Sequence, residues 1–181
     1  MKRIGTFLFA VCVACLAFAQ SDVRVHDSKG TPIGLSSNRM LGLVLGAEAI
    51  PGIRLKDGVN TYIELNSSPY HDVPAYSSIS RVWDGPTGSE MDLVRIEIRV
   101  FLSEAIAKKQ LELMRQRSAA MFSKTDAKSL GYDLAFRSVQ PNCGILMAAK
   151  GRMTISINVM GDGDQTKRVN ELSTRQSKLL R

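Results

Sequence analysis

The stretch that decides the fold is residues 94–122, which read VRIEIRVFL and then SEAIAKKQLELMRQRSAAMF. From Val94 to Leu102 apolar residues alternate with charged ones, and this period of two predicts a half-buried strand. Over residues 105–122 apolar residues recur at helical spacing among Lys, Arg and Glu, which predicts an amphipathic helix. Ser103 lies between the two segments, where its hydroxyl can cap the helix N-terminus.

The chain downstream of this unit predicts three more strands, at residues 132–139, 144–149 and 152–160, and a last helix after Asp164. Turn residues separate the strands, which is typical of an antiparallel meander. We therefore expect an α+β fold, with a mainly antiparallel sheet and two amphipathic helices on one face. The expected common core comprises Ile96, Ile98, Leu111, Met114, Ile155 and Ile157. The apolar stripe of the last helix comprises Val169, Leu172, Leu179 and Leu180.

The N-terminal part, residues 20–90, is predicted to be β-rich. Residues 53–55 and 59–65 flank Asp57-Gly58, and Asp-Gly between alternating runs favours a hairpin. Residues 76–83 predict another strand, whereas residues 40–49 fit either a short helix or a strand. Residues 20–90 form either extra strands of the same sheet or a small β subdomain. Residues 91–181 form the α+β core module.

The first nineteen residues have the layout of a cleavable secretory signal peptide. Lys2 and Arg3 precede an apolar run over residues 4–18, and Ala17-Phe18-Ala19 places small residues at the cleavage positions before Gln20. This run is shorter than the roughly 20 residues of a transmembrane helix, and no later apolar run is long enough. We expect an exported chain, periplasmic or secreted, whose mature part is one ordinary domain with no transmembrane span.

The cysteines leave one alternative to free export. Cys12 and Cys15 lie in the signal, so Cys143 alone remains after cleavage and cannot form an intramolecular disulfide. Acylation of Cys15 would instead give a lipid-anchored protein. Ala14 fits a lipoprotein signal, but Cys12 stands where a Leu or similar residue is usual.

The positive charge is concentrated at the C-terminus. The formal net charge of +7 falls to +5 without the two basic residues of the signal, and most of the excess lies in residues 165–181. These basic residues predict a face for an anionic surface or protein partner, or a face that is simply solvated. They are Lys167, Arg168, Arg175, Lys178 and Arg181, against Glu171 alone. Export and the absence of aromatic residues after Phe136 disfavour nucleic acid as the partner.

The sequence nominates no catalytic, cofactor-binding or metal-ligating residue. His26 and His71 are far apart and no ligand set clusters around them, and no nucleophile or phosphate-loop motif occurs. The leading hypothesis is an exported, non-catalytic binding or interaction module of unknown ligand. The alternatives are an envelope or extracellular hydrolase that uses carboxylates or His71, and a lipid-anchored structural lipoprotein through Cys15. A deep cleft that gathers His71 with carboxylates would favour the hydrolase.

Overall fold

The computed structural model describes residues 34–35, 37–56, 60–62, 77–86, 89, 91–118 and 120–180. The signal peptide, both histidines, the Asp57-Gly58 turn and Arg181 lie outside these residues. The elements are α1 (Ser37–Leu43), a 3-10 turn η1 (Ala47–Ala49), β1 (Arg54–Leu55), β2 (Asn60–Tyr62), β3 (Ser77–Asp84), β4 (Leu93–Val100), α2 (Glu104–Arg117), β5 (Ser123–Lys124), β6 (Leu134–Gln140), β7 (Cys143–Lys150), β8 (Met153–Met160) and α3 (Gln165–Ser177).

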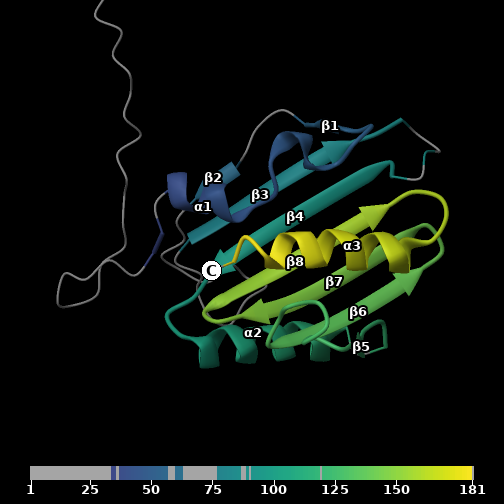
Figure 1. The fold of residues 1–181 in the computed structure, drawn as a ribbon. Helices are drawn as coiled ribbons and strands as arrows, with labels where there is room; N and C mark the ends of the chain where they lie inside the picture. Colours follow the sequence, from purple (N-terminus) through teal and green to yellow (C-terminus); the bar gives the residue numbers. More distant parts are fainter. Residues whose placement is uncertain are drawn as a thin grey trace, which may run out of the picture.

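The strands form one antiparallel sheet in the order β1-β3-β4-β8-β7-β6-β5 (Figure 1). Its eight strands occupy seven positions, because β1 and β2 both pair with β3. The predicted α+β class with a mainly antiparallel sheet is confirmed. Among the described residues, no helix has the length and apolar character needed to cross a membrane.

The strand predicted at residues 94–102 forms β4, at the centre of the sheet. Strand β4 pairs with β3 on one side and β8 on the other, and its apolar residues Val94, Ile96 and Ile98 are fully buried. The Ser103 hydroxyl accepts a hydrogen bond from the Ile106 N–H at 3.3 Å, so the predicted helix cap is confirmed. Helix α2 ends at Arg117, five residues before the predicted end at 122.

The two long helices lie on opposite faces of the sheet, which differs from the expected placement on one face (Figure 1). Strand β7 shows this directly. Leu146 and Ala148 belong to the core beneath α3, whereas Met147 and Ala149 cluster with Leu111 of α2. Successive residues of a strand point to opposite faces, so β7 is covered on both sides.

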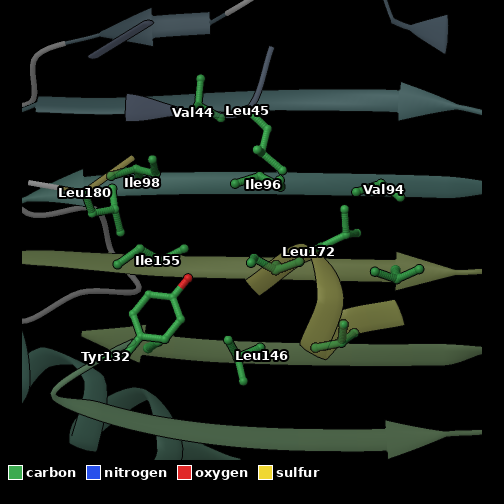
Figure 2. Close-up of a cluster of buried hydrophobic side chains, with 14 of the residues drawn as sticks. Val44, Leu45, Val94, Ile96, Ile98, Tyr132, Leu146, Ile155, Leu172 and Leu180 are labelled. Carbon is green, nitrogen blue, oxygen red and sulfur yellow. The ribbon is translucent and has the colours of Figure 1, made fainter. Parts of the chain in front are cut away.

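The expected single core is therefore divided. The four predicted isoleucines of β4 and β8 are buried on the α3 side, whereas Leu111 and Met114 pack on the α2 side. Figure 2 shows Ile96, Ile98 and Ile155 of the sheet beside Leu172 and Leu180 from the C-terminal segment.

Tyr132 joins the α3-side core and links it to the helix. Its side chain is buried in the cluster shown in Figure 2, and its hydroxyl donates to the Ser173 carbonyl oxygen at 3.0 Å. Burial raises the pKa of the Tyr132 phenol, because the ionised form loses its hydration. The phenol thus stays protonated as a hydrogen-bond donor to α3.

Helix α3 begins as predicted but ends differently. The Asp164 carboxylate accepts from the Lys167 N–H at 3.0 Å, which is the expected cap. Val169 and Leu172 are buried, but Leu179 is 38% exposed because the helix ends at Ser177 and Leu180 turns inward instead.

A polar side chain takes one of the buried positions of α3 and ties the helix to the α1 segment. The Gln176 side-chain oxygen accepts from the Leu45 N–H at 3.1 Å, and its amide nitrogen donates to the Leu43 carbonyl oxygen. The sequence pattern showed only the apolar stripe and did not indicate this link.

The hairpin predicted around Asp57-Gly58 is wrong. Arg54 pairs with Asp84 and Asn60 pairs with Ser80, so β1 and β2 run in the same direction along one edge of β3. Strand β3 is long enough to give both short segments an antiparallel partner, and they do not pair with each other.

Candidate functional site

The sheet face that carries α2 is divided into an apolar half and a polar half. Helix α2 packs on β7 and β8, over the cluster formed by Leu111, Phe136, Met147 and Ala149. Strands β3, β4 and β8 carry polar side chains on the same face. Between these halves lies a hollow of about 150 Å³, which we call the α2 groove. It is lined by Glu97, Arg99, Leu111, Met114, Met147, Thr154, Ile155 and Ser156.

One wall of the α2 groove is a row of charges on β4. Arg95, Glu97 and Arg99 alternate along the strand and so share one face. Arg95 Nη2 lies 3.0 Å from Glu97 Oε2, and Arg99 Nε binds Glu97 Oε1. The Glu97 and Arg99 side chains are only 14% and 18% exposed, so the ion pair between them is screened less than a surface pair.

The floor of the α2 groove is a row of hydroxyls on β8. In the sheet register Thr154 lies opposite Arg99, and Ser156 lies opposite Glu97. Neither hydroxyl forms a hydrogen bond with another described residue, and of the Arg99 guanidinium only Nε does so. On the other side of Arg99, the buried Ser78 Oγ also has no described partner. The fold thus leaves several hydrogen-bonding groups of this face unused.

The opposite wall of the groove is apolar and comes from α2 and β7. Leu111 and Met147 are almost fully buried, while Met114 is partly buried against them. The Arg115 guanidinium stacks 5.4 Å from the centre of the Phe136 ring, a cation–π contact that helps to hold α2 on the sheet. The groove therefore presents apolar surface directly beside a guanidinium and two hydroxyls.

This arrangement suits binding better than acid–base chemistry. The only carboxylate of the groove, Glu97, is held between two arginines, which occupy both of its oxygens. The alternation of residues 94–102 predicted a half-buried strand, but it did not indicate a site on the polar side of that strand. The alternating Arg95, Glu97 and Arg99 are visible in the sequence. The residues that lie beside them, Thr154 and Ser156, are known only from the register between β4 and β8.

The basic residues predicted for an anionic partner are only partly brought together. Lys167 and Arg175 of α3 and Lys178 just after it are exposed, on the other side of the sheet from the α2 groove. Arg168 is half-buried and donates to the Asp162 carbonyl oxygen. Glu171 is exposed within the same helical stripe, and Arg181 lies outside the described residues.

The C-terminal end of α3 gathers further lysines. Lys128, Lys150 and Lys178 line a shallow hollow of about 350 Å³ at this end. Lys150 Nζ donates to the Ser177 carbonyl oxygen at 2.8 Å, so this ammonium group caps the last turn of the helix. Cations are favoured there because the helix dipole and the free carbonyl groups are negative.

The other groups considered from the sequence do not assemble a site in the described part of the chain. Within it, no three His, Cys, Asp or Glu residues are placed to hold a metal ion. Cys143 is a free, half-buried thiol at the start of β7. His26 and His71 fall outside the described residues.

Comparisons with known proteins leave the family open. No protein-family model and no curated protein matches the sequence. Among solved structures, the chain is similar to a GTP binding regulator from Thermotoga maritima, with a TM-score of 0.46 and 14% sequence identity. The match covers 86% of this chain and 94% of the other.

Proposed function

We propose that the chain is an exported, non-catalytic binding module and that the α2 groove is its ligand site. The observation that carries the proposal is the set of unused donors on Arg99, Thr154 and Ser156, beside an apolar wall. A partly desolvated donor without a partner costs free energy in the unliganded protein. A ligand that accepts these hydrogen bonds and covers Met114 recovers that free energy.

Binding is preferred to hydrolysis because of the contacts of Glu97. General acid catalysis requires a carboxyl group that can reach the substrate and transfer a proton to it. Both oxygens of Glu97 are instead held in ion pairs with Arg95 and Arg99. A hydrolase that uses His71 remains the rival proposal, and loss of a hydrolytic activity in His71→Ala would support it.

The methionines offer a direct test of the site. The probe is anilinonaphthalene sulfonate, which combines an apolar ring system with an anionic group. The measurement is the NMR chemical shift of the ¹³C-labelled Met methyl groups of the purified protein as the probe is added. Met114 and Met147 line the groove, whereas Met121 and Met160 are each 47% exposed elsewhere.

We expect saturable shifts at the two groove methionines and much smaller shifts at the two exposed ones. Shifts only at the exposed methionines, or none at all, would refute the groove as the site. Met114→Trp is the matched variant, because a larger side chain fills the hollow without altering the β4 charge row.

A second candidate function is attachment to an anionic surface through α3. Lys167, Arg175 and Lys178 support it, because all three are exposed on α3 or at its C-terminal end. The test is retention on anionic vesicles at low and high salt, for the native protein and for the triple variant Arg168→Gln, Arg175→Gln and Lys178→Gln. Salt-sensitive retention lost in the variant supports attachment, since exposed charges are screened beyond about 8 Å at physiological ionic strength. Equal retention of both proteins contradicts it.

A further inference from the structure

The groups that line the α2 groove specify the chemistry of a ligand. Arg99 uses its Nε for Glu97, and its two terminal amino groups have no described partner. Thr154 lies directly across from it and adds a free hydroxyl. A guanidinium edge with two N–H donors matches the two oxygens of a carboxylate, which it binds in a bidentate manner. A carboxylate therefore fits the polar side of the groove.

The apolar side of the groove specifies a small group. The whole hollow of the groove, between its polar and apolar walls, measures about 150 Å³. An apolar cavity of about this volume holds a benzene molecule. One aliphatic side chain fits such a space, whereas a long acyl chain does not. Two of the four apolar residues that line the groove are methionines, which adapt their shape to different aliphatic groups.

The carboxylate and the apolar group must also lie close together, because Arg99 and Met114 line the same small hollow. Both groups are attached to one Cα atom in the last residue of a peptide. An internal residue carries a similar side chain but no carboxylate at that position. The polar face next to the groove, with Ser80 and Asn158 half-buried on β3 and β8, leaves room for the preceding residues.

We infer that the α2 groove, if it is the ligand site proposed above, binds the free C-terminus of a peptide whose last residue is aliphatic. The Arg99 guanidinium pairs with the terminal carboxylate, and the side chain of that residue lies against Met114. The ligand is recognised by its end and by one side chain, so the upstream sequence contributes little to specificity.

The test measures fluorescence anisotropy with labelled pentapeptides that differ only at the last position. The reference peptide is Gly-Ser-Gly-Ser-Leu with a free carboxylate, and the comparisons carry a C-terminal amide or a final Gly. We expect each change to weaken binding by about tenfold or more, because each removes a charge-assisted contact or the apolar contact. Equal binding of the free and amidated peptides overturns the inference.

Two arginine variants provide the matched comparison. Arg99→Gln should abolish the preference for the free carboxylate. Arg95→Gln should keep it, because Arg95 shares the ion-pair row with Glu97 but does not line the groove. If both variants lose the preference equally, the charge row and not Arg99 is responsible, and the inference fails. Met114→Trp should block the binding of all peptides. It tests the groove with Arg99 in place, so the result does not depend on whether Arg99→Gln folds.

Competition with octanoate distinguishes a peptide ligand from a fatty acid. We expect octanoate to displace the reference peptide only weakly, because its chain exceeds the hollow. Displacement at equal concentration identifies a fatty acid as the ligand and overturns the peptide assignment. If no peptide binds while the sulfonate probe still shifts Met114 and Met147, the groove remains a ligand site and only the ligand class is wrong.

Discussion

Gly144 of β7 provides the sharpest test of how α3 sits on the sheet. A Cβ atom at this position would lie 2.7 Å from Val169 Cγ2 and 3.1 Å from both Cβ and the carbonyl oxygen of Gln165. Carbon atoms in contact are normally about 3.5–4.0 Å apart, so Gly144→Ala overlaps α3 by about 1 Å. The first turn of the helix must shift away from the sheet. Overpacking of this kind costs about 1–3 kcal/mol in the free energy of unfolding.

Urea denaturation measures this loss. With a slope of about 2 kcal/mol per molar, we expect the midpoint to fall by about 0.5–1.5 M. The control is Gly42→Ala in α1, where a Cβ meets no atom within 4 Å and replacing a helical glycine stabilises by up to about 1 kcal/mol.

Val169→Ala should cost less stability in the Gly144→Ala background than in the native protein, because there it also removes the nearest clashing atom while Gln165 stays in place. The expected coupling between the two sites is about 0.5 kcal/mol or more. A loss below about 0.5 kcal/mol for Gly144→Ala, or strict additivity of the two changes, would show that α3 does not approach β7 as closely as described.

Three further predictions concern alkaline stability, the core and processing. The Tyr132 pKa is raised above its usual 10.0, so the unfolded chain ionises first and stability should fall above about pH 10, by up to about 1.4 kcal/mol per pH unit. Urea midpoints between pH 8 and 11 should show that Tyr132→Phe removes this decline, and an unchanged slope would contradict it. Ile98→Ala, in the α3-side core, should cost about 2–5 kcal/mol in the same assay, and a loss below about 0.5 kcal/mol would contradict its burial. Mass spectrometry of the exported protein should find Gln20 at the N-terminus, whereas an acylated Cys15 would establish the lipoprotein alternative.

The secondary structure of the C-terminal half was largely predictable because several of its elements, such as β4, β8 and α2, follow one simple period. Strand β8 alternates throughout, and its apolar residues Ile155, Ile157 and Val159 are buried as the pattern indicates. The caps at Ser103 and Asp164 were likewise predictable, because a cap depends on residues within one turn.

The placement of the helices was not predictable from their own sequences. An amphipathic stripe identifies the side of a helix that is buried, but not the face of the sheet that it covers. The informative signal was in β7, where the run from Gly144 to Ala149 is apolar without alternation. Such a run is typical of a strand covered on both faces, and β7 contacts both α2 and α3, as the neighbouring β8 also does.

The α2 groove was beyond sequence analysis for a different reason. Arg99 and Thr154 face each other across two strands that are far apart in the chain, and only the register between β4 and β8 brings them together. The predicted basic face was drawn from one continuous segment instead. Neighbouring charges on a helix are visible in a sequence, whereas a site assembled across strands is not.

The geometry of the sheet explains why unused donors lie on the α2 side. Neighbouring strands are about 4.8 Å apart and a helix with its side chains is about 10 Å wide, so one helix covers about two strands. Both α1 and α3 contribute to the core of one face, whereas α2 is the one described helix on the other and contacts β7 and β8. The charge row of β4 therefore lies just beyond its reach. Because Arg99 is nevertheless mostly buried, water satisfies its donors less fully than at an open surface, and a ligand carboxylate has the most to gain at this boundary.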